Sequence, residues 1–239
     1  MIAAVVICFH VGYNAFYIQT FEYLIVNHFK MEWMRMPGFT ISDQSTRNSQ
    51  PLNKLPKLVS RSMVIENGMN FLQEMGSDHI CKVCISNGGS CCSGCRHLSN
   101  GVGCQKRNTS CTAWLCGFLK YMLYETGLLQ EWNDFWDQVP GQDYREDFTP
   151  EYFFTQKSLH IQNMRVLSEA LASDLHELAR SHIAIGFILT LREKIDKNID
   201  QLTYCKNDPA RETKIKRNIK ILSSHFHHFH KALSEFYPR

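Results

Sequence analysis

Residues 81–116 carry eight of the ten cysteines of the chain, in the stretch CKVCISNGGSCCSGCRHLSNGVGCQKRNTSCTAWLC. The eight are Cys81, Cys84, Cys91, Cys92, Cys95, Cys104, Cys111 and Cys116. Two C-x-x-C pairs begin at Cys81 and at Cys92, and such a pair holds two thiolates close enough to bind the same ion. With the four further thiols, the pairs can complete a tetrahedral zinc site or a four-thiolate iron–sulfur cluster. The stretch therefore predicts a metal site that pins an irregular loop in place.

The grouping of these thiols does not follow from their spacing, which leaves open one metal site or two. We expect the two C-x-x-C pairs to share an ion, with Cys104, Cys111 and Cys116 as the next candidates. Interleaved glycines suit a backbone that bends tightly around an ion. They are Gly88, Gly89, Gly94, Gly101 and Gly103.

Two other uses of these cysteines compete with a metal site. A disulfide framework is typical of short secreted domains, but this chain is long and lacks the basic region and cleavage site of a secretory signal. Buried cysteines without metal would leave adjacent thiols open to oxidation. Clustered free thiols instead indicate a reducing compartment, so we expect a cytoplasmic protein. Cys205, far from the cluster, is expected to be a lone surface or semi-buried thiol rather than a ninth ligand.

The cluster resembles a family of small bacterial proteins described as zinc- or iron-chelating domains, named for a C-x-x-C-x-x-C-C signature. The matching positions are Cys81, Cys84, Cys91, Cys92, Gly103, Cys104, Arg107, Cys111 and Cys116. The resemblance is limited to residues 81–116, with a longer gap before the doublet and with Asn108 where proline usually follows the arginine. It implies that these cysteines bind zinc or iron, and it implies nothing about the rest of the chain.

The composition is that of one folded domain, alone or with an extension. A chain of 239 residues with 44% hydrophobic residues can bury a full core. The net charge of +3 is too small to indicate a nucleic-acid-binding protein by itself. The sequence contains no phosphate-binding glycine loop, no H-E-x-x-H motif, no nucleophile elbow and no zinc-deaminase pattern. No catalytic residues are therefore predicted, and whether the protein is an enzyme stays open.

We expect three segments along the chain. Residues 1–36 form a hydrophobic N-terminal extension, within which residues 2–21 carry no charge and are long enough to span a bilayer. Three polar side chains inside that span would be costly in hydrocarbon, so a dispensable extension from a non-native start is favoured over a membrane anchor, and an anchor over a core helix. Residues 37–58 are polar and contain prolines, which predicts a linker. Residues 59–239 are expected to form a single helical domain that contains the metal site.

Apolar residues at spacings of three to four predict an all-α fold, a helical bundle with the irregular cysteine-rich loop inserted before a central helix. The expected helices span about 56–75, 112–138, about 167–202 as one helix or a helix pair, and 209–236. The connection over 139–150 is rich in turns, and everything beyond residue 151 is expected to be helical.

Local signals mark some of the helix ends. Gly127 and Gly186 are weak points, and Asp208 before Pro209 is a capped helix start. Cys111 and Cys116 fall at the start of the central helix, where the backbone amides favour a thiolate over a thiol.

Two polar runs near the C-terminus offer further sites. The sequence HFHHFH at residues 225–230 places histidine pairs on one helix face for a second metal, although solvated histidines are the simpler interpretation. A basic run just upstream could touch phosphates, although most such runs are solvated. It comprises Arg211, Lys214, Lys216, Arg217 and Lys220.

We therefore predict a metal-binding accessory protein that holds zinc or an iron–sulfur cluster. The alternative is a metal-dependent nucleic-acid-binding or DNA-repair-associated factor that uses the basic C-terminal helix. A protein partner stays open, and a membrane partner is expected only if residues 1–30 are a genuine anchor.

Overall fold

The computed structural model describes residues 56–92, 94–99, 103–143, 146–160, 162–182, 184, 186–205 and 208–237. By its internal contacts the chain divides into Met1–Leu52 and Asn53–Arg239, and everything described lies in the second unit. The predicted N-terminal extension, and the predicted linker up to residue 55, lie outside the described residues.

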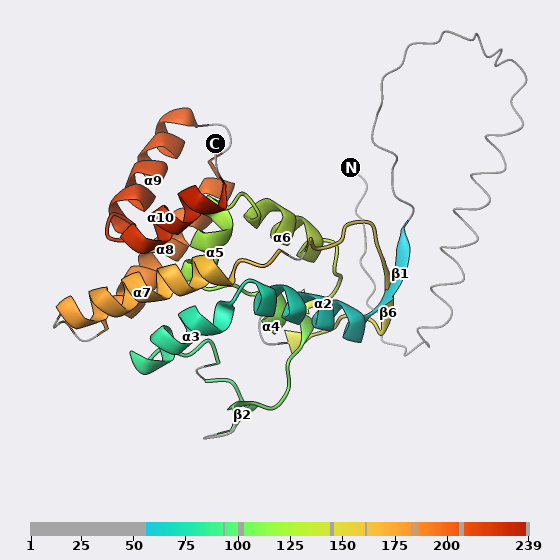
Figure 1. The fold of residues 1–239 in the computed structure, drawn as a ribbon. Coiled ribbons are helices and arrows are strands. Elements are labelled where there is room, and N and C mark those ends of the chain that lie inside the picture. Colours follow the sequence, from blue (N-terminus) through green and yellow to red (C-terminus); the bar gives the residue numbers. More distant parts are fainter. Residues whose placement is uncertain are drawn as a thin grey trace, which may run out of the picture. The chain divides into compact units, whose positions relative to one another are not determined.

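The described unit is mostly helical, which agrees with the predicted fold class at that level (Figure 1). Its helices are α2 (Arg61–Glu74), α3 (Ser77–Ser86), α4 (Thr109–Ala113), α5 (Gly117–Glu125), α6 (Leu129–Trp136), α7 (Arg165–Ser181), α8 (Phe187–Thr203), α9 (Pro209–Leu222) and α10 (His227–Phe236). Its strands form three antiparallel pairs. They are β1 (Lys57–Ser60) with β6 (Tyr152–Thr155), β2 (Leu98–Ser99) with β3 (Gly103–Cys104), and β4 (Gln142–Asp143) with β5 (Glu146–Asp147).

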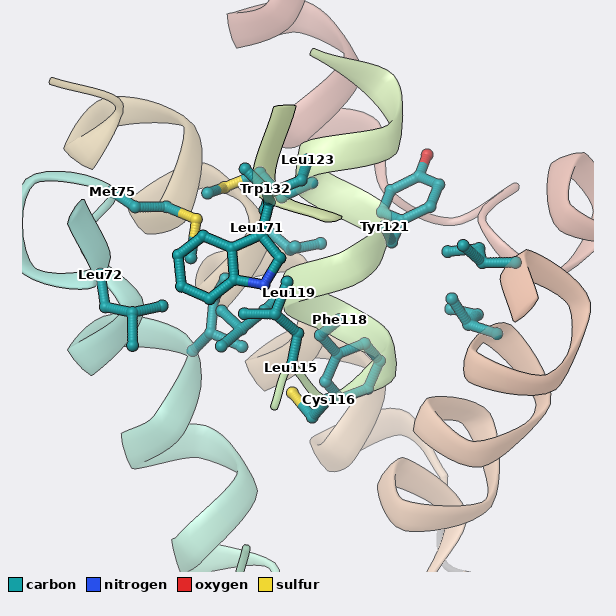
Figure 2. Close-up of a cluster of buried hydrophobic side chains, with 14 of the residues drawn as sticks. Leu72, Met75, Leu115, Cys116, Phe118, Leu119, Tyr121, Leu123, Trp132 and Leu171 are labelled. Carbon is teal, nitrogen blue, oxygen red and sulfur yellow. The ribbon is translucent and has the colours of Figure 1, made fainter. Parts of the chain in front are cut away.

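The helices surround one hydrophobic core. Helix α7 contacts both α3 and α10, and α8 contacts both α5 and α9. Figure 2 shows the indole ring of Trp132 among apolar side chains such as Leu72 and Leu119, while Cys116 lies beside Phe118 at the margin of the same cluster. The core thus extends to one of the predicted metal ligands.

The first predicted helix begins later than expected, because residues 57–60 form strand β1. This strand pairs with β6, where Val59 lies opposite Phe153 and both are buried. The same pairing makes the expectation of helix throughout the chain beyond residue 151 wrong, since β6 follows directly. A strand that forms by pairing with a distant segment leaves little trace in local periodicity.

The predicted central helix is three helices, α4, α5 and α6. Trp114 is extended after α4, with φ −73° and ψ 129°, which ends the first helix. Gly127 adopts a left-handed conformation with φ 75°, which separates α5 from α6, so the expected weak point is a true break.

The C-terminal half matches the predicted helix pair and adds one break. Helix α7 ends at Ser181, because His182 is extended, and α8 starts after Gly186, which has a φ of 81°. Asp208 caps α9 by accepting a hydrogen bond from the amide of Arg211 at 3.0 Å, which confirms the predicted cap. The last predicted helix is divided into α9 and α10, because Phe226 turns into the core and is fully buried between them. Of the helices in the described ranges, none is both long enough and apolar enough to cross a membrane.

Candidate metal centre

The first part of the predicted irregular loop is helical. Cys81 and Cys84 lie on α3, three residues apart and therefore on one face of the helix. Gly76, with φ 75°, allows α3 to start directly after α2. Ile80 and Val83 are buried, and α3 packs against α7. A packed helix, rather than a loop, therefore carries the first C-x-x-C pair.

After α3 the chain folds back over Cys84. The amide of Gly89 donates to the carbonyl oxygen of Cys84 at 2.8 Å. A Cβ atom on residue 89 would lie 2.3 Å from the sulfur of Cys84, so only glycine allows the backbone to pass so close to the thiol. The chain then reaches Cys91 and Cys92, where the amide of Cys92 donates to the hydroxyl of Ser90 at 3.2 Å.

The second C-x-x-C pair lies in turns that lead into a small hairpin. The amide of Cys95 donates to the carbonyl oxygen of Cys92 at 2.9 Å. The amide of Leu98 donates to the carbonyl oxygen of Cys95 at 3.2 Å. Strands β2 and β3 then pair Leu98 with Cys104. The hairpin therefore returns Cys104 towards the second C-x-x-C pair.

Cys111 and Cys116 lie on the two short helices that follow. The side chain of Asn108 caps α4 by accepting a hydrogen bond from the amide of Cys111 at 2.7 Å. Cys116 occupies the N-cap position of α5 and is buried. The single helix start expected for these two cysteines is thus two helix starts, one for each.

All eight predicted ligands line one cavity of about 710 Å³. All eight are free thiols. Apolar side chains such as Leu72, Ile80 and Leu119 form the walls, and Arg107 and Arg165 add positive charge. The cysteine-rich stretch therefore does bring its thiols together on a shared space, although its first part is helical.

Burial raises the pKa of several of these thiols far above the usual value. Burial, followed by the nearby charges of Cys116 and Cys84, raises the pKa of Cys81 to about 11. Partial burial of its sulfur, followed by the nearby charges of Cys81 and Cys84, raises the pKa of Cys91 to about 11, although the residue as a whole is exposed. Burial raises the pKa of Cys116 to about 12, and backbone amides at the start of α5 offset only part of that rise. The predicted preference for a thiolate at this helix start is outweighed by burial when no cation is present.

Cys92 has different neighbours. Burial raises its pKa, and the largest contributions from other thiols come from Cys104, Cys95 and Cys111. The thiols that raise the pKa of Cys81 most are, by contrast, Cys116 at the start of α5 and Cys84 of the first C-x-x-C pair. Cys81 and Cys92 thus have different nearby thiols, which argues against the expectation that the two C-x-x-C pairs share one ion.

An arginine that the sequence did not reveal reaches the thiols from α8. Nη1 of Arg192 donates to the sulfur of Cys84 at 3.2 Å, and only 15% of the Arg192 side chain is exposed. Gly117 lets α5 approach the backbone of Arg192, because a Cβ atom there would lie 2.0 Å from the Arg192 carbonyl oxygen. Arg107 lies near enough to both C-x-x-C pairs to offset some of the rise in pKa that burial causes at Cys81 and Cys92.

The thiols have the donor chemistry of zinc and iron–sulfur centres, and their separations set a condition on binding. In a tetrahedral zinc site with Zn–S bonds of about 2.3 Å, the sulfurs lie about 3.8 Å apart. Within the described ranges, no three thiols lie within 4.8 Å of one another. A zinc ion would have to draw the sulfurs together, whereas a cluster of several iron atoms holds them farther apart.

Cys205 and the basic run lie away from this cavity. Cys205 does not line the cavity, which agrees with a thiol apart from the cluster, but the predicted surface or semi-buried position is wrong, because Cys205 is a core residue with 2% exposure. The basic run lies on α9, where Lys216 pairs with Glu212 at 2.6 Å and the other basic side chains are exposed. A face of this kind is compatible with solvent and with phosphate contacts.

The histidine run forms the start of α10 and has protein partners. The ring Nε2 of His230 lies 2.9 Å from the hydroxyl of Tyr121. Asp174, Glu177 and His228 bring three potential ligand atoms within 4.8 Å. Asp174 is buried, however, and its two oxygens accept backbone amides in the first turn of α10 at 3.0 and 2.9 Å. Helix capping and an exposed contact of 3.1 Å between Nε2 of His228 and Glu177 account for this group without a metal.

Comparisons of the chain with protein-family models, with curated proteins and with solved structures found no match. The resemblance of residues 81–116 to the zinc- or iron-chelating family therefore stays a prediction that rests on its motif alone. Support for a function has to come from the geometry of the thiols.

Proposed function

We propose that this protein binds a metal centre, zinc or an iron–sulfur cluster, on the thiolates of its cysteine-rich segment. The candidate ligands are Cys81, Cys84, Cys91, Cys92, Cys95, Cys104, Cys111 and Cys116. The observation that carries the proposal is that eight free thiols line a single cavity. Thiolates gathered at this density repel one another, and a bound cation removes that repulsion and holds them in the ionised form.

The charges around the cavity also support the proposal. A metal ion bound by four thiolates carries a net negative charge, which is costly inside a protein unless positive groups lie close to it. Arg192 donates a hydrogen bond to a sulfur without taking the place of a ligand, and Arg107 lies close to both C-x-x-C pairs. Hydrogen bonds of this kind to the outer side of a ligand stabilise its charged form and fix its orientation.

The centre would act as a structural element or as a redox group of an accessory protein. Zinc would join α3, the β2–β3 hairpin, α4 and α5, so its binding free energy would contribute to folding and be lost on chelation. An iron–sulfur cluster would let the same segment carry electrons or respond to oxidants. Both versions need reduced thiols, so we place the protein in the cytoplasm as part of the proposal.

Anaerobic purification followed by metal analysis and absorption spectroscopy tests the proposal. We expect stoichiometric metal: iron with a brown colour and absorption near roughly 400 nm for a cluster, or zinc in a colourless protein. Replacing the two buried thiols, Cys84→Ser with Cys116→Ser, is expected to lower the amount of metal bound. Cys205→Ser is the matched control, because it also alters a buried cysteine but one outside the cavity. A reduced protein that takes up neither zinc nor iron, and whose melting temperature a chelator leaves unchanged, would refute the proposal.

The alternative function is nucleic-acid binding through α9, combined with the metal centre. It is supported by the exposure of the basic side chains of that helix. Retention on DNA that falls steeply with salt is expected for this function, and weaker retention is expected after Lys214→Ala with Arg217→Ala. Absence of binding at low salt would dismiss it.

A further inference from the structure

We infer that the eight thiols form two separate four-thiolate centres, connected by the doublet Cys91–Cys92. The inner set consists of Cys81, Cys84, Cys91 and Cys116. The outer set consists of Cys92, Cys95, Cys104 and Cys111. The inference rests on the proposed function, because it assumes that these thiols bind metal. It assigns four ligands to each of two ions, a grouping that does not follow from the spacing of the cysteines.

The inner set is built on packed helices. Cys81 and Cys84 lie on one face of α3, and α3 contacts α5, at whose N-cap Cys116 lies. Cys84 and Cys116 are both buried. Gly89 carries the backbone directly across the sulfur of Cys84, and the fourth member, Cys91, follows two residues later. Three ligands thus come from rigid elements and one from a loop that returns over them.

The outer set is built on the hairpin and on α4. The turn that joins the amide of Cys95 to the carbonyl oxygen of Cys92 closes the second C-x-x-C pair, and the pairing of β2 with β3 brings Cys104 back beside it. Cys111 lies close enough to Cys92 to raise its pKa, and Arg107, whose Nη2 donates to the carbonyl oxygen of Cys111 at 3.5 Å, lowers the same pKa. The members of this set therefore share a small surface unit.

Each set contains one residue of the doublet: Cys91 is in the inner set and Cys92 is in the outer set. Among the other thiols, Cys81 and Cys84 contribute most to the raised pKa of Cys91. The thiols that contribute most to the raised pKa of Cys92 are Cys104 and Cys95, followed by Cys111. Two adjacent residues with separate sets of neighbours are expected where one chain passes between two ions. A single shared ion would give both residues the same neighbours.

The two sets differ in exposure, which predicts a difference in exchange. Two inner thiols are buried, with Cys84 at 6% and Cys116 at 4% exposure, whereas Cys81 is partly exposed and Cys91 is exposed. In the outer set, Cys104 is exposed and the other three are partly exposed. Inner metal also lies next to Arg192, which would hold a sulfur of its site in place. A chelator is therefore expected to remove the outer metal at least tenfold faster than the inner metal.

Zinc titration of the reduced, metal-free full-length protein tests the arrangement, with native mass spectrometry to count bound ions. Four thiolates bind zinc whichever centre the protein carries in the cell, so zinc is a suitable probe for both versions. We expect two zinc ions for the wild type and for Cys205→Ser. We expect one for Cys104→Ser with Cys111→Ser. Cobalt(II) substitution identifies zinc bound elsewhere, because thiolate-to-cobalt absorption grows with the number of thiolates bound.

Chelator kinetics then assign each half of the doublet. The wild type is expected to release zinc in a fast and a slow phase. Cys92→Ser should remove the fast phase and Cys91→Ser the slow one, and circular dichroism checks that each variant is folded. One zinc in the wild type, or loss of both ions from folded Cys92→Ser, overturns the two-centre arrangement and leaves the proposed function standing. No zinc uptake by the wild type overturns both.

Discussion

Gly117 allows the closest approach between α5 and α8, and a single methyl group there tests how the candidate site is supported. A Cβ atom at this position would lie 2.0 Å from the carbonyl oxygen of Arg192 and 2.8 Å from the backbone nitrogen of Asp196. Both neighbours are backbone atoms, so no change of rotamer can relieve the contact. Gly117→Ala therefore has to push α5 and α8 apart by more than an ångström.

The expected loss follows from two opposing effects. Inserting a methyl group where backbone must move destabilises a core by about 1–3 kcal/mol and sometimes by more. The better helix propensity of alanine returns at most about 1 kcal/mol. We expect Gly117→Ala to lower the free energy of unfolding by about 1–2 kcal/mol, which corresponds to a fall of about 2–8 °C in Tm for a domain of this size. Thermal denaturation of the reduced, metal-free protein, followed by circular dichroism, measures it.

The same variant carries a second readout at the thiols. Moving the backbone of Arg192 weakens its hydrogen bond to the sulfur of Cys84, so metal release from the loaded protein is expected to accelerate. Gly127→Ala is the matched control: its left-handed φ of 75° imposes a strain of about 1 kcal/mol, but no atom lies within 4 Å of the added methyl group. If Gly117→Ala were no less stable than this control and released metal at the wild-type rate, the close crossing of α5 and α8 would be wrong.

Further predictions concern protons and helix caps. Metal binding by the inner set is expected to strengthen with pH and to release at least three protons, measured by titration in weak buffer, because the pKa of three of its thiols is about 11 or 12 and each must ionise to bind. For the same reason the metal-free protein is expected to lose stability as pH rises from about 9 to 11, since folded thiols hold their protons more tightly than unfolded ones; urea denaturation at both pH values checks the sign. Tyr121→Phe removes a buried hydroxyl 2.9 Å from His230 and is expected to lower the free energy of unfolding by about 1–2 kcal/mol in urea. Asp174→Ala uncaps α10 and is expected to lower it by about 2–3 kcal/mol, whereas Glu177→Ala, in an exposed contact, should change it by less than about 0.5 kcal/mol in the same assay.

The helix ends that could be predicted from the sequence are those that depend on residues close by in the chain. Gly186 precedes α8 because its own backbone is left-handed, and Asp208 starts α9 because its side chain reaches an amide three residues away. The ends that sequence missed depend on distant partners. β1 forms because β6 pairs with it, and α10 starts where Asp174 of α7 caps its amides. Local periodicity carries no information about either partner.

The candidate site divides in the same way. The identity of the eight thiols could be predicted because residue type and density report the chemistry directly, and all eight line the cavity. The part played by Arg192 could not be predicted, because it depends on how α8 packs on α5. Gly117 allows that packing, yet a lone glycine beside a cysteine has many simpler explanations in a sequence.

The doublet shows why spacing is a poor guide to which thiols share an ion. A signature groups residues by their separation along the chain, whereas an ion groups sulfurs that lie close in space. Cys91 and Cys92 are adjacent, but the turn at Gly89 carries the chain back over α3 at the first, and the hairpin begins just after the second. Cys84 and Cys116 are far apart in sequence, but contact between α3 and α5 brings both into the same buried wall. If folded Cys91→Ser and Cys92→Ser released their remaining metal with identical kinetics, the chain path would not separate the thiols, and the two-centre arrangement would be wrong.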